Sequence, residues 1–146
     1  MRRKILWSIL IIGLIAQAFQ PDRSAPVADP AKHIEHVLQV PVDVSIILAK
    51  ACYDCHSDST RFPWYSYFTP VNFWQQDHIN EGREKVNFSA WGGYPPERMA
   101  KILKKIKHEV SEGDMPLPSY TWMHGDARLS DAERKSLIDF FGGLKP

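Results

Sequence analysis

The chain has 146 residues, of which 44% are hydrophobic and 24% are charged, and its formal net charge is +1. This composition is ordinary for one folded domain with short additional segments, and it excludes a wholly disordered protein. Three positive charges come from Arg2, Arg3 and Lys4, so the rest of the chain is slightly acidic. Such a balance gives no electrostatic reason to expect a nucleic-acid partner.

Residues 1–20 have the pattern of an export signal. A basic start, M-R-R-K, precedes an apolar run from Ile5 to Phe19. This run suits the hydrophobic region of a signal better than a spanning helix, which needs about 20 residues. Ala16-Gln17-Ala18 has the form of a cleavage site, but Phe19-Gln20-Pro21 follows it. We therefore expect a signal peptide or a retained membrane anchor, with a tether through residues 5–19 and a periplasmic or outer-face location.

Residues 21–39 are predicted to be a linker, because they are at first rich in proline and small residues. Residues 40–146 are predicted to form one all-α domain, since no convincing strand alternation occurs in them. The first helix is expected over 41–51, with Val42, Ile46 and Ala49 on one face.

Three further helices are predicted in chain order. The second covers 71–82, and the third runs from the residues after Pro95-Pro96 to Glu112, before Gly113. The fourth begins at Ser130-Asp131-Ala132-Glu133, which has the spacing of a capping box, and is expected to stop at Gly142-Gly143.

Residues 52–56 read C-Y-D-C-H, a C-x-x-C-H motif, which is the attachment signature of c-type haem. The spacing fits that chemistry, because two thiols one turn apart can reach two vinyl groups on one porphyrin edge. The histidine that follows can give an imidazole nitrogen to the iron. The motif therefore predicts one haem c on Cys52 and Cys55, with His56 as a ligand of the iron.

Other uses of two cysteines fit less well. A thioredoxin-like dithiol follows a strand, and here a helix is predicted before the motif. A structural zinc site needs four ligands, and the nearby His33 and His36 lie in the predicted linker. A disulfide between Cys52 and Cys55 would close a very small loop and stabilise little. A redox dithiol remains the main alternative.

Met115 is the predicted second ligand of the iron. It lies in G-D-M-P-L-P, where Gly113 ends a predicted helix and two prolines stiffen the loop. Met123 is the next candidate, and Met99 is expected in the core. The histidines that could replace a methionine are His78, His108 and His124.

Residues 62–74 contain seven aromatic side chains, which are expected to wall the haem pocket and exclude water. Arg83, Trp64 and Tyr120 are candidate hydrogen-bond donors to the haem propionates. A basic patch on the third predicted helix comprises Lys101, Lys104, Lys105 and Lys107. Such a patch is usually a solvated face, and a docking surface for an acidic redox partner is the alternative.

Three long stretches resemble the bacterial haem-binding domain proteins, which are small cytochrome-c-like modules. They are A-C-Y-D-C-H-S-D-S-T-R-F-P-W-Y-S-Y, H-I-N-E-G-R-E-K-V-N-F-S-A-W and G-D-M-P-L-P-S-Y, and the resemblance covers residues 40–142. It implies that Cys52 and Cys55 carry the thioether links, that His56 is the proximal ligand and that Met115 is the distal ligand.

The residues and the resemblance together predict an exported, monohaem, cytochrome-c-type domain that exchanges electrons with redox partner proteins. With both axial positions of the iron filled by side chains, no residue is expected to act as an acid, base or nucleophile. A haem-based sensor or binding module, or a peroxidase-like enzyme with a labile Met115, are the alternatives.

Overall fold

The structure is a computed structural model, and it describes residues 1–25, 27 and 29–145. These residues form helices and no strand, as predicted. The α-helices are α1 (Arg2–Ala16), α2 (Ile34–Val37), α3 (Val42–Ala51), α4 (Tyr53–His56), α5 (Val71–Lys85), α6 (Pro96–Glu112), α7 (Pro118–Met123) and α8 (Asp131–Gly143). Short 3₁₀ helices connect them: η1 (Pro30–Lys32), η2 (Trp64–Tyr67), η3 (Phe88–Gly93) and η4 (Gly125–Ala127).

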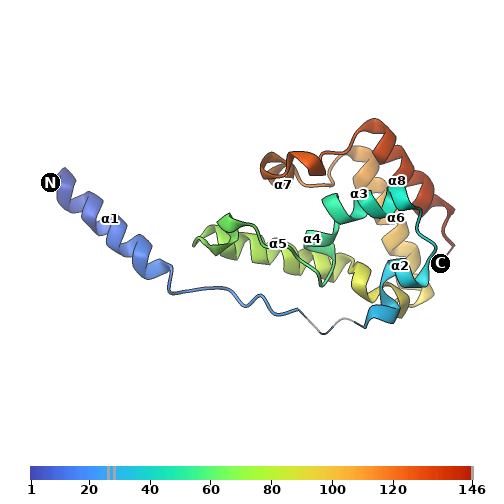
Figure 1. Cartoon of the computed structure of the whole chain (residues 1–146), viewed down its shortest axis with the longest axis horizontal. Helices are drawn as coiled ribbons and strands as arrows, with labels where there is room; N and C mark the ends of the chain where they lie inside the picture. Colours follow the sequence, from blue (N-terminus) through green and yellow to red (C-terminus); the bar gives the residue numbers. More distant parts are fainter. Residues whose placement is uncertain (26, 28, 146) are drawn as a thin grey trace.

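The helices fall into two parts of the molecule. In Figure 1, α1 lies alone at one end, whereas α3, α6 and α8 lie together at the other. α8 packs against both α6 and α3, and α4 packs against α5. α5 runs between these regions, from the end nearer α1 to the packed helices.

The hydrophobic core lies between the packed helices. Its most completely buried large side chains include Phe141, Leu48, Leu137 and Ile34. Ile34 belongs to α2, within the stretch predicted to be a linker, and α2 packs against η3. The packed domain therefore includes residues that precede position 40.

α3 has the predicted bounds but buries a different face, so the predicted face is wrong. Its buried residues are Val44, Ile47, Leu48 and Ala51. Val42 and Ile46, on the predicted face, are 77% and 60% exposed. The sequence V-D-V-S-I-I-L-A is apolar on both sides, so its periodicity does not distinguish the two faces.

The predictions for the later helices are confirmed, with two adjustments. α6 ends at Gly113, whose φ of 84° lies in the left-handed region that glycine adopts without strain. α8 begins with the capping box, in which Ser130 Oγ accepts from the Glu133 backbone N–H at 3.3 Å. α5 continues beyond its predicted end to Lys85, and α8 continues through both glycines to Gly143.

Within the described part of the chain, no helix combines the length and the hydropathy that crossing a membrane requires. α1 has 15 residues, and none of them is buried.

Candidate functional site

A cavity of about 370 Å³ lies among α3, α4, α6 and α8, beside the end of α5. Its walls are largely apolar: α6 contributes Ile102, Ile106 and Val110, and α8 contributes Leu137 and Phe141. Pockets that hold small ligands and cofactors have volumes of roughly 300–1,000 Å³ and similar walls. The cavity is therefore of a size and character to take an apolar cofactor.

Three of the four predicted site residues line this cavity. Cys52 and His56 come from the motif, and Met115 comes from the loop after α6. Cys55, the fourth, lies in α4 between Cys52 and His56 but is not one of the lining residues. The fold thus brings His56 and Met115, which are far apart in the sequence, to the same apolar space.

The motif itself forms one turn of helix. The backbone N–H groups of Cys55 and His56 donate to the carbonyl oxygen of Cys52, at 3.2 and 2.9 Å. Cys52 directly precedes α4 and Cys55 lies within it, so the two cysteines are about one helical turn apart. Both are free thiols. The buried face of α3, with Leu48 and Ala51, also lines the cavity and continues directly into Cys52.

The His56 ring is held by two backbone carbonyl groups. Its Nδ1 atom lies 2.9 Å from the oxygen of Gly82 and 3.1 Å from the oxygen of Val86. Carbonyl oxygens only accept, so Nδ1 carries the proton and Nε2 retains its lone pair. Burial lowers the pKa of His56, which also favours the neutral ring. A neutral imidazole whose Nδ1 donates to a carbonyl has the protonation state of a metal ligand.

Gly82 allows α5 to approach the motif closely enough for this contact. A Cβ atom at this position would lie 2.7 Å from the carbonyl oxygen of Cys55, and that oxygen belongs to the backbone and cannot swing away. Glycine is therefore required here by the close approach of two helices. Gly82 therefore has two roles: it lets α5 and α4 pack closely, and its carbonyl oxygen orients the ring of His56.

The two thiols are less acidic than those of a reactive dithiol. Burial raises the pKa of the Cys52 thiol to about 12 and that of the Cys55 thiol to about 11. Nucleophilic cysteines instead have a lowered pKa, because the thiolate is the reactive form. Within residues 1–25, 27 and 29–145, no group of three or more His, Cys, Asp or Glu side chains is arranged to hold a metal ion. The described residues therefore do not fit a zinc site of that type.

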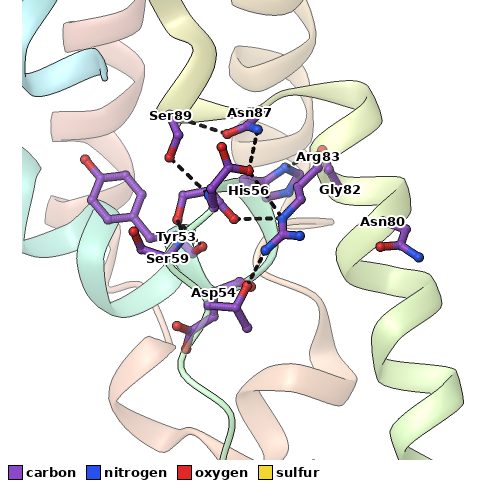
Figure 2. A network of polar contacts seen from close by, with 12 residues as sticks. Tyr53, Asp54, His56, Ser59, Asn80, Gly82, Arg83, Asn87 and Ser89 are labelled. Atoms are coloured by element: carbon purple, nitrogen blue, oxygen red, sulfur yellow. Dashed lines mark hydrogen bonds and ion pairs between the residues drawn. The ribbon is translucent and has the colours of Figure 1, made fainter. Parts of the chain in front are cut away.

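A polar network fixes the chain just after His56. The Arg83 Nε donates to the carbonyl oxygen of Ser57 at 2.8 Å, and the Arg83 guanidinium lies 3.8 Å from the Asp58 carboxylate. Asn87 Nδ2 donates to Asp58 Oδ1 at 2.8 Å, and the Asp58 backbone N–H donates to Ser89 Oγ at 3.0 Å. Figure 2 shows Arg83, Asn87 and Ser89 gathered around this segment. The network thus connects the residues after His56 to the end of α5, through Arg83, and to the start of η3, through Asn87 and Ser89.

This network corrects the expectation for Arg83. The Arg83 donors are directed to the loop after the motif, and Arg83 does not line the cavity. Tyr120 and Trp64 also lie outside the cavity lining. Sequence reasoning did not single out Asp58 and Asn87, although both lie in the stretches that carry the family resemblance.

Met115 is placed by the end of α6. The left-handed Gly113 ends the helix, and the Met115 backbone N–H then donates to the carbonyl oxygen of Glu109 at 3.1 Å. This bond folds the loop back against the last turns of α6. The half-buried Met115 and the next residue, Pro116, both line the cavity.

The competing candidates for the second ligand lie elsewhere. Met99 lines a separate cavity, and Met123 is 49% exposed on α7. Neither lines the cavity that contains His56, and neither do the three alternative histidines, His78, His108 and His124. Among these residues, the geometry favours Met115.

The aromatic stretch does not wall this cavity, so that expectation is wrong. None of the aromatic side chains of residues 62–74 lines the cavity, and Trp64 is 70% exposed. The aromatic residues that do line it are Phe88 of η3 and Phe141 of α8. Most of the aromatic side chains of residues 62–74 are on the outside of the molecule, on η2 and the start of α5.

One part of the cavity lining is charged. Its cationic residues are Lys85, Arg98, Lys101 and Lys105, and its acidic residues are Glu84 and Glu109. Arg98 is held in place, because its guanidinium lies 4.8 Å from the centre of the Tyr94 ring and donates to the carbonyl oxygen of Glu84 at 3.0 Å. We call these six residues the charged rim. The predicted basic patch is thereby divided, because Lys104 and Lys107 line a different hollow beside α8.

An all-helical domain with an apolar cavity, a neutral, half-buried histidine and a methionine at that cavity has the character of a cofactor-binding protein. The family model for the haem-binding domain matches residues 11–142, nearly the whole chain. The chain therefore belongs to the haem-binding domain family, and its cofactor is haem. No curated protein and no solved structure matches the chain.

Proposed function

We propose that this protein is a monohaem c-type cytochrome that transfers electrons, with haem attached to Cys52 and Cys55 and the iron held by His56 and Met115. One observation carries the proposal: His56 and Met115 line a single apolar cavity, with Cys52 beside them. When bound, haem supplies a one-electron iron couple. If both axial positions are filled by side chains, no open position on the iron is left for a small substrate, which favours electron transfer over catalysis.

The position of Cys52 at the cavity, with Cys55 one turn further along, supports covalent attachment. Each S–H group would add across one vinyl group, with sulfur bonding to one carbon and the hydrogen moving to the other. This addition is balanced without an oxidant. Both thiols are protonated at neutral pH, because burial raises their pKa.

The charged rim provides partners for the haem propionates. Its four positive and two negative side chains leave an excess of two positive charges, which would balance the two negative charges of the propionates. Lys85 also pairs with Glu81 at 2.5 Å, so Arg98, Lys101 and Lys105 are the more available cations. The propionate edge would then lie between the end of α5 and α6, and the apolar walls would cover the rest of the macrocycle.

We also propose that the protein is exported. The basic start and the apolar α1 support this assignment, and covalent haem attachment outside the cytoplasm agrees with it. The partners would then be redox proteins of the periplasm or of the outer face of the inner membrane.

Absorption spectra of the haem-loaded protein test the axial ligands. We expect a far-red band from methionine on ferric iron, which disappears in Met115→Ala. Met123→Ala is the matched control, because it removes the same side chain from an exposed position outside the cavity, and it should keep the band. A high-spin ferric spectrum in the unmodified protein, together with a rapid reaction with peroxide, would instead favour the enzyme.

Denaturation tests the attachment. Protein produced with haem-maturation machinery should keep its colour when unfolded in acid and organic solvent, which extracts haem that is not covalently bound. Cys52→Ser combined with Cys55→Ser should lose the colour under the same conditions. Loss of colour from the unmodified protein would refute covalent attachment while leaving haem binding itself intact.

A further inference from the structure

Five exposed aromatic side chains lie on η2 and the start of α5, between α1 and the packed helices (Figure 1). They are Trp64, Tyr67, Phe68, Phe73 and Trp74, and their exposure ranges from 39% to 70%. We call this group the aromatic surface. Monomeric soluble proteins seldom leave large apolar groups clustered in water, so such a surface indicates an interaction site.

The segment that follows α1 is fastened beside this surface. The Gln17 side chain accepts from the backbone N–H of Thr69 at 3.1 Å and donates to the carbonyl oxygen of Thr69 at 3.3 Å. The buried Asn72 donates to Gln20 Oε1 at 3.0 Å. The backbone of the loop between η2 and α5, and a side chain in the first turn of α5, are thus held by residues that come just after α1.

Arg23 adds a second attachment. Its guanidinium donates to the carbonyl oxygen of Ser66 at 2.5 Å and lies 4.5 Å from the centre of the Tyr67 ring and 5.2 Å from that of Phe62. Contacts of this kind between a cation and aromatic rings are attractive. They hold residues 17–23 against η2 and the start of α5, so α1 ends close to the aromatic surface (Figure 1).

α1 is itself an uncovered apolar element. Its isoleucine and leucine side chains are at least half exposed, and its basic residues, Arg2, Arg3 and Lys4, lie at the end farther from the aromatic surface. The family match begins at residue 11, so it includes the last six residues of α1 and the residues that fasten it.

We propose that the aromatic surface lies in the headgroup layer of a lipid bilayer that receives α1, and that α1 is retained in the mature protein. A bilayer is the one occupant that would cover both adjoining surfaces, because it presents hydrocarbon to α1 and a polar–apolar boundary to the ring of aromatic side chains. Trp and Tyr concentrate at that boundary, since they join a large apolar body to a polar group. This proposal rests on export of the protein but not on the identity of the iron ligands.

Quenching of tryptophan fluorescence by brominated lipid tests the proposal in the full-length, haem-loaded chain. The probe is a vesicle of phosphatidylethanolamine and phosphatidylglycerol, with or without bromine on the acyl chains. Each variant keeps the buried Trp91 and one other tryptophan, either Trp7 of α1, Trp64, Trp74 or Trp122, with phenylalanine at the remaining positions. A fifth variant with Trp91 alone, which is 2% exposed, is the control, and the 80% exposed Trp122 of α7, whose end contacts Tyr65 of η2 through His124, shows how far the lipid contact extends.

Trp7, Trp64 and Trp74 should each be quenched several-fold more than Trp91 alone. Quenching of Trp64 and Trp74 no greater than that of Trp91, with Trp7 quenched, would show that the aromatic surface faces water or another protein, and it would overturn the proposal. An unquenched Trp7 would overturn it as well. The haem spectrum of each sample shows separately whether the domain is folded and the iron ligated.

The contacts of residues 17–23 give a second test. Gln17→Ala combined with Arg23→Ala should reduce the quenching of Trp64 and Trp74 several-fold and leave that of Trp7 unchanged, because α1 stays in the bilayer while the domain is released. The unsubstituted chain provides a check that needs no tryptophan variants. Vesicles should protect peptide 62–74 from hydroxyl-radical oxidation and leave peptide 96–112 of α6, which lies among the packed helices (Figure 1), unprotected. Equal protection of both peptides would contradict the proposal.

Discussion

The hydroxyl group of Tyr120 donates a 2.7 Å hydrogen bond to Oδ2 of Asp54, which lies between the two cysteines of the motif. Tyr120 belongs to α7, close after Met115 in the chain, and the same carboxylate also accepts two hydrogen bonds from the side chain of Arg61 and one from its backbone N–H. Burial and this hydrogen bond raise the pKa of Tyr120, so the hydroxyl remains a donor at neutral pH. The contact therefore connects the segment that carries Met115 to the turn that carries His56.

Removal of this hydroxyl should loosen the Met115 loop. In Tyr120→Phe we expect the free energy of unfolding to fall by about 1–2 kcal/mol, because a hydrogen bond to a charged acceptor is lost. Added imidazole should also displace Met115 from the iron at lower concentration than in the unmodified protein. Tyr67→Phe removes an exposed hydroxyl and serves as the control. Equal imidazole affinities in all three proteins would show that Tyr120 does not position the loop.

Gly82→Ala should disturb the site at His56, where α5 packs against the motif. The new Cβ would lie 2.7 Å from the Cys55 carbonyl oxygen, so α5 must move away from α4 and take the His56 acceptors with it. Forced shifts of this kind typically cost about 1–3 kcal/mol. We expect lower stability in urea unfolding and a changed haem spectrum. Gly143→Ala, where an added Cβ meets nothing within 4 Å, should preserve both.

Glu133 should make stability depend on pH in the acid range. The hydrogen bond from Lys50, at 2.5 Å, and those from Ser130 lower the pKa of Glu133 to about 2, from an ordinary value near 4.5. Between these values the unfolded chain binds a proton that the folded chain does not, so this contribution to stability is complete above pH 4.5 and is lost as pH falls towards 2.

Unfolding in urea at several pH values measures this effect. Glu133→Gln should be less stable than the unmodified protein at pH 7, and the difference should shrink between pH 4.5 and 2. Solvent screens the pair, because both side chains are partly exposed, so we expect a modest difference. Glu112→Gln, at an exposed carboxylate at the end of α6, is the control, and its free energy of unfolding should change with pH as that of the unmodified protein does. A constant difference for Glu133→Gln at all pH values would contradict the assignment.

The charged rim should influence the iron more than the rest of the basic face of α6. Lys101→Gln combined with Lys105→Gln should lower the reduction potential, because nearby positive charge disfavours the ferric state. Lys104→Gln combined with Lys107→Gln changes the net charge equally but acts outside the cavity, so its shift should be smaller. Spectroelectrochemical titration at low ionic strength measures both. Equal shifts would place the propionates away from Lys101 and Lys105.

The parts of the molecule that could be predicted from the sequence depend on local chemistry. The capping box at Ser130 and Glu133 and the left-handed cap at Gly113 place α8 and the end of α6, because each satisfies groups within a few residues. Met115 follows such a cap, and this local feature is enough to make it a candidate ligand. The C-x-x-C-H spacing is likewise local, and it predicts haem attachment without any knowledge of the packing.

The parts that could not be predicted depend on long-range packing. Periodicity could not choose between the two apolar faces of α3, and the choice is made by α8, against which α3 packs. The many aromatic residues among 62–74 suggest a buried segment, but the structure exposes most of them. Arg23 and Gln17, which contact this region, lie more than 40 residues away in the sequence, so their contacts could not be predicted from it. The walls formed by Phe88 and Phe141 arise in the same way, from segments distant in the chain.

α5 has a geometrical consequence for electron exchange. It begins at the aromatic surface and ends at the carbonyl groups that hold His56, and its 15 residues correspond to about 22 Å at the usual helical rise. If the aromatic surface marks the bilayer, this helix is a rigid spacer that sets the height of the iron above the lipid. Electrons would then pass to and from the extramembrane parts of partner proteins rather than carriers dissolved in the hydrocarbon layer. The length of one helix, and not only the charges at the cavity, would decide which partners the protein can reach.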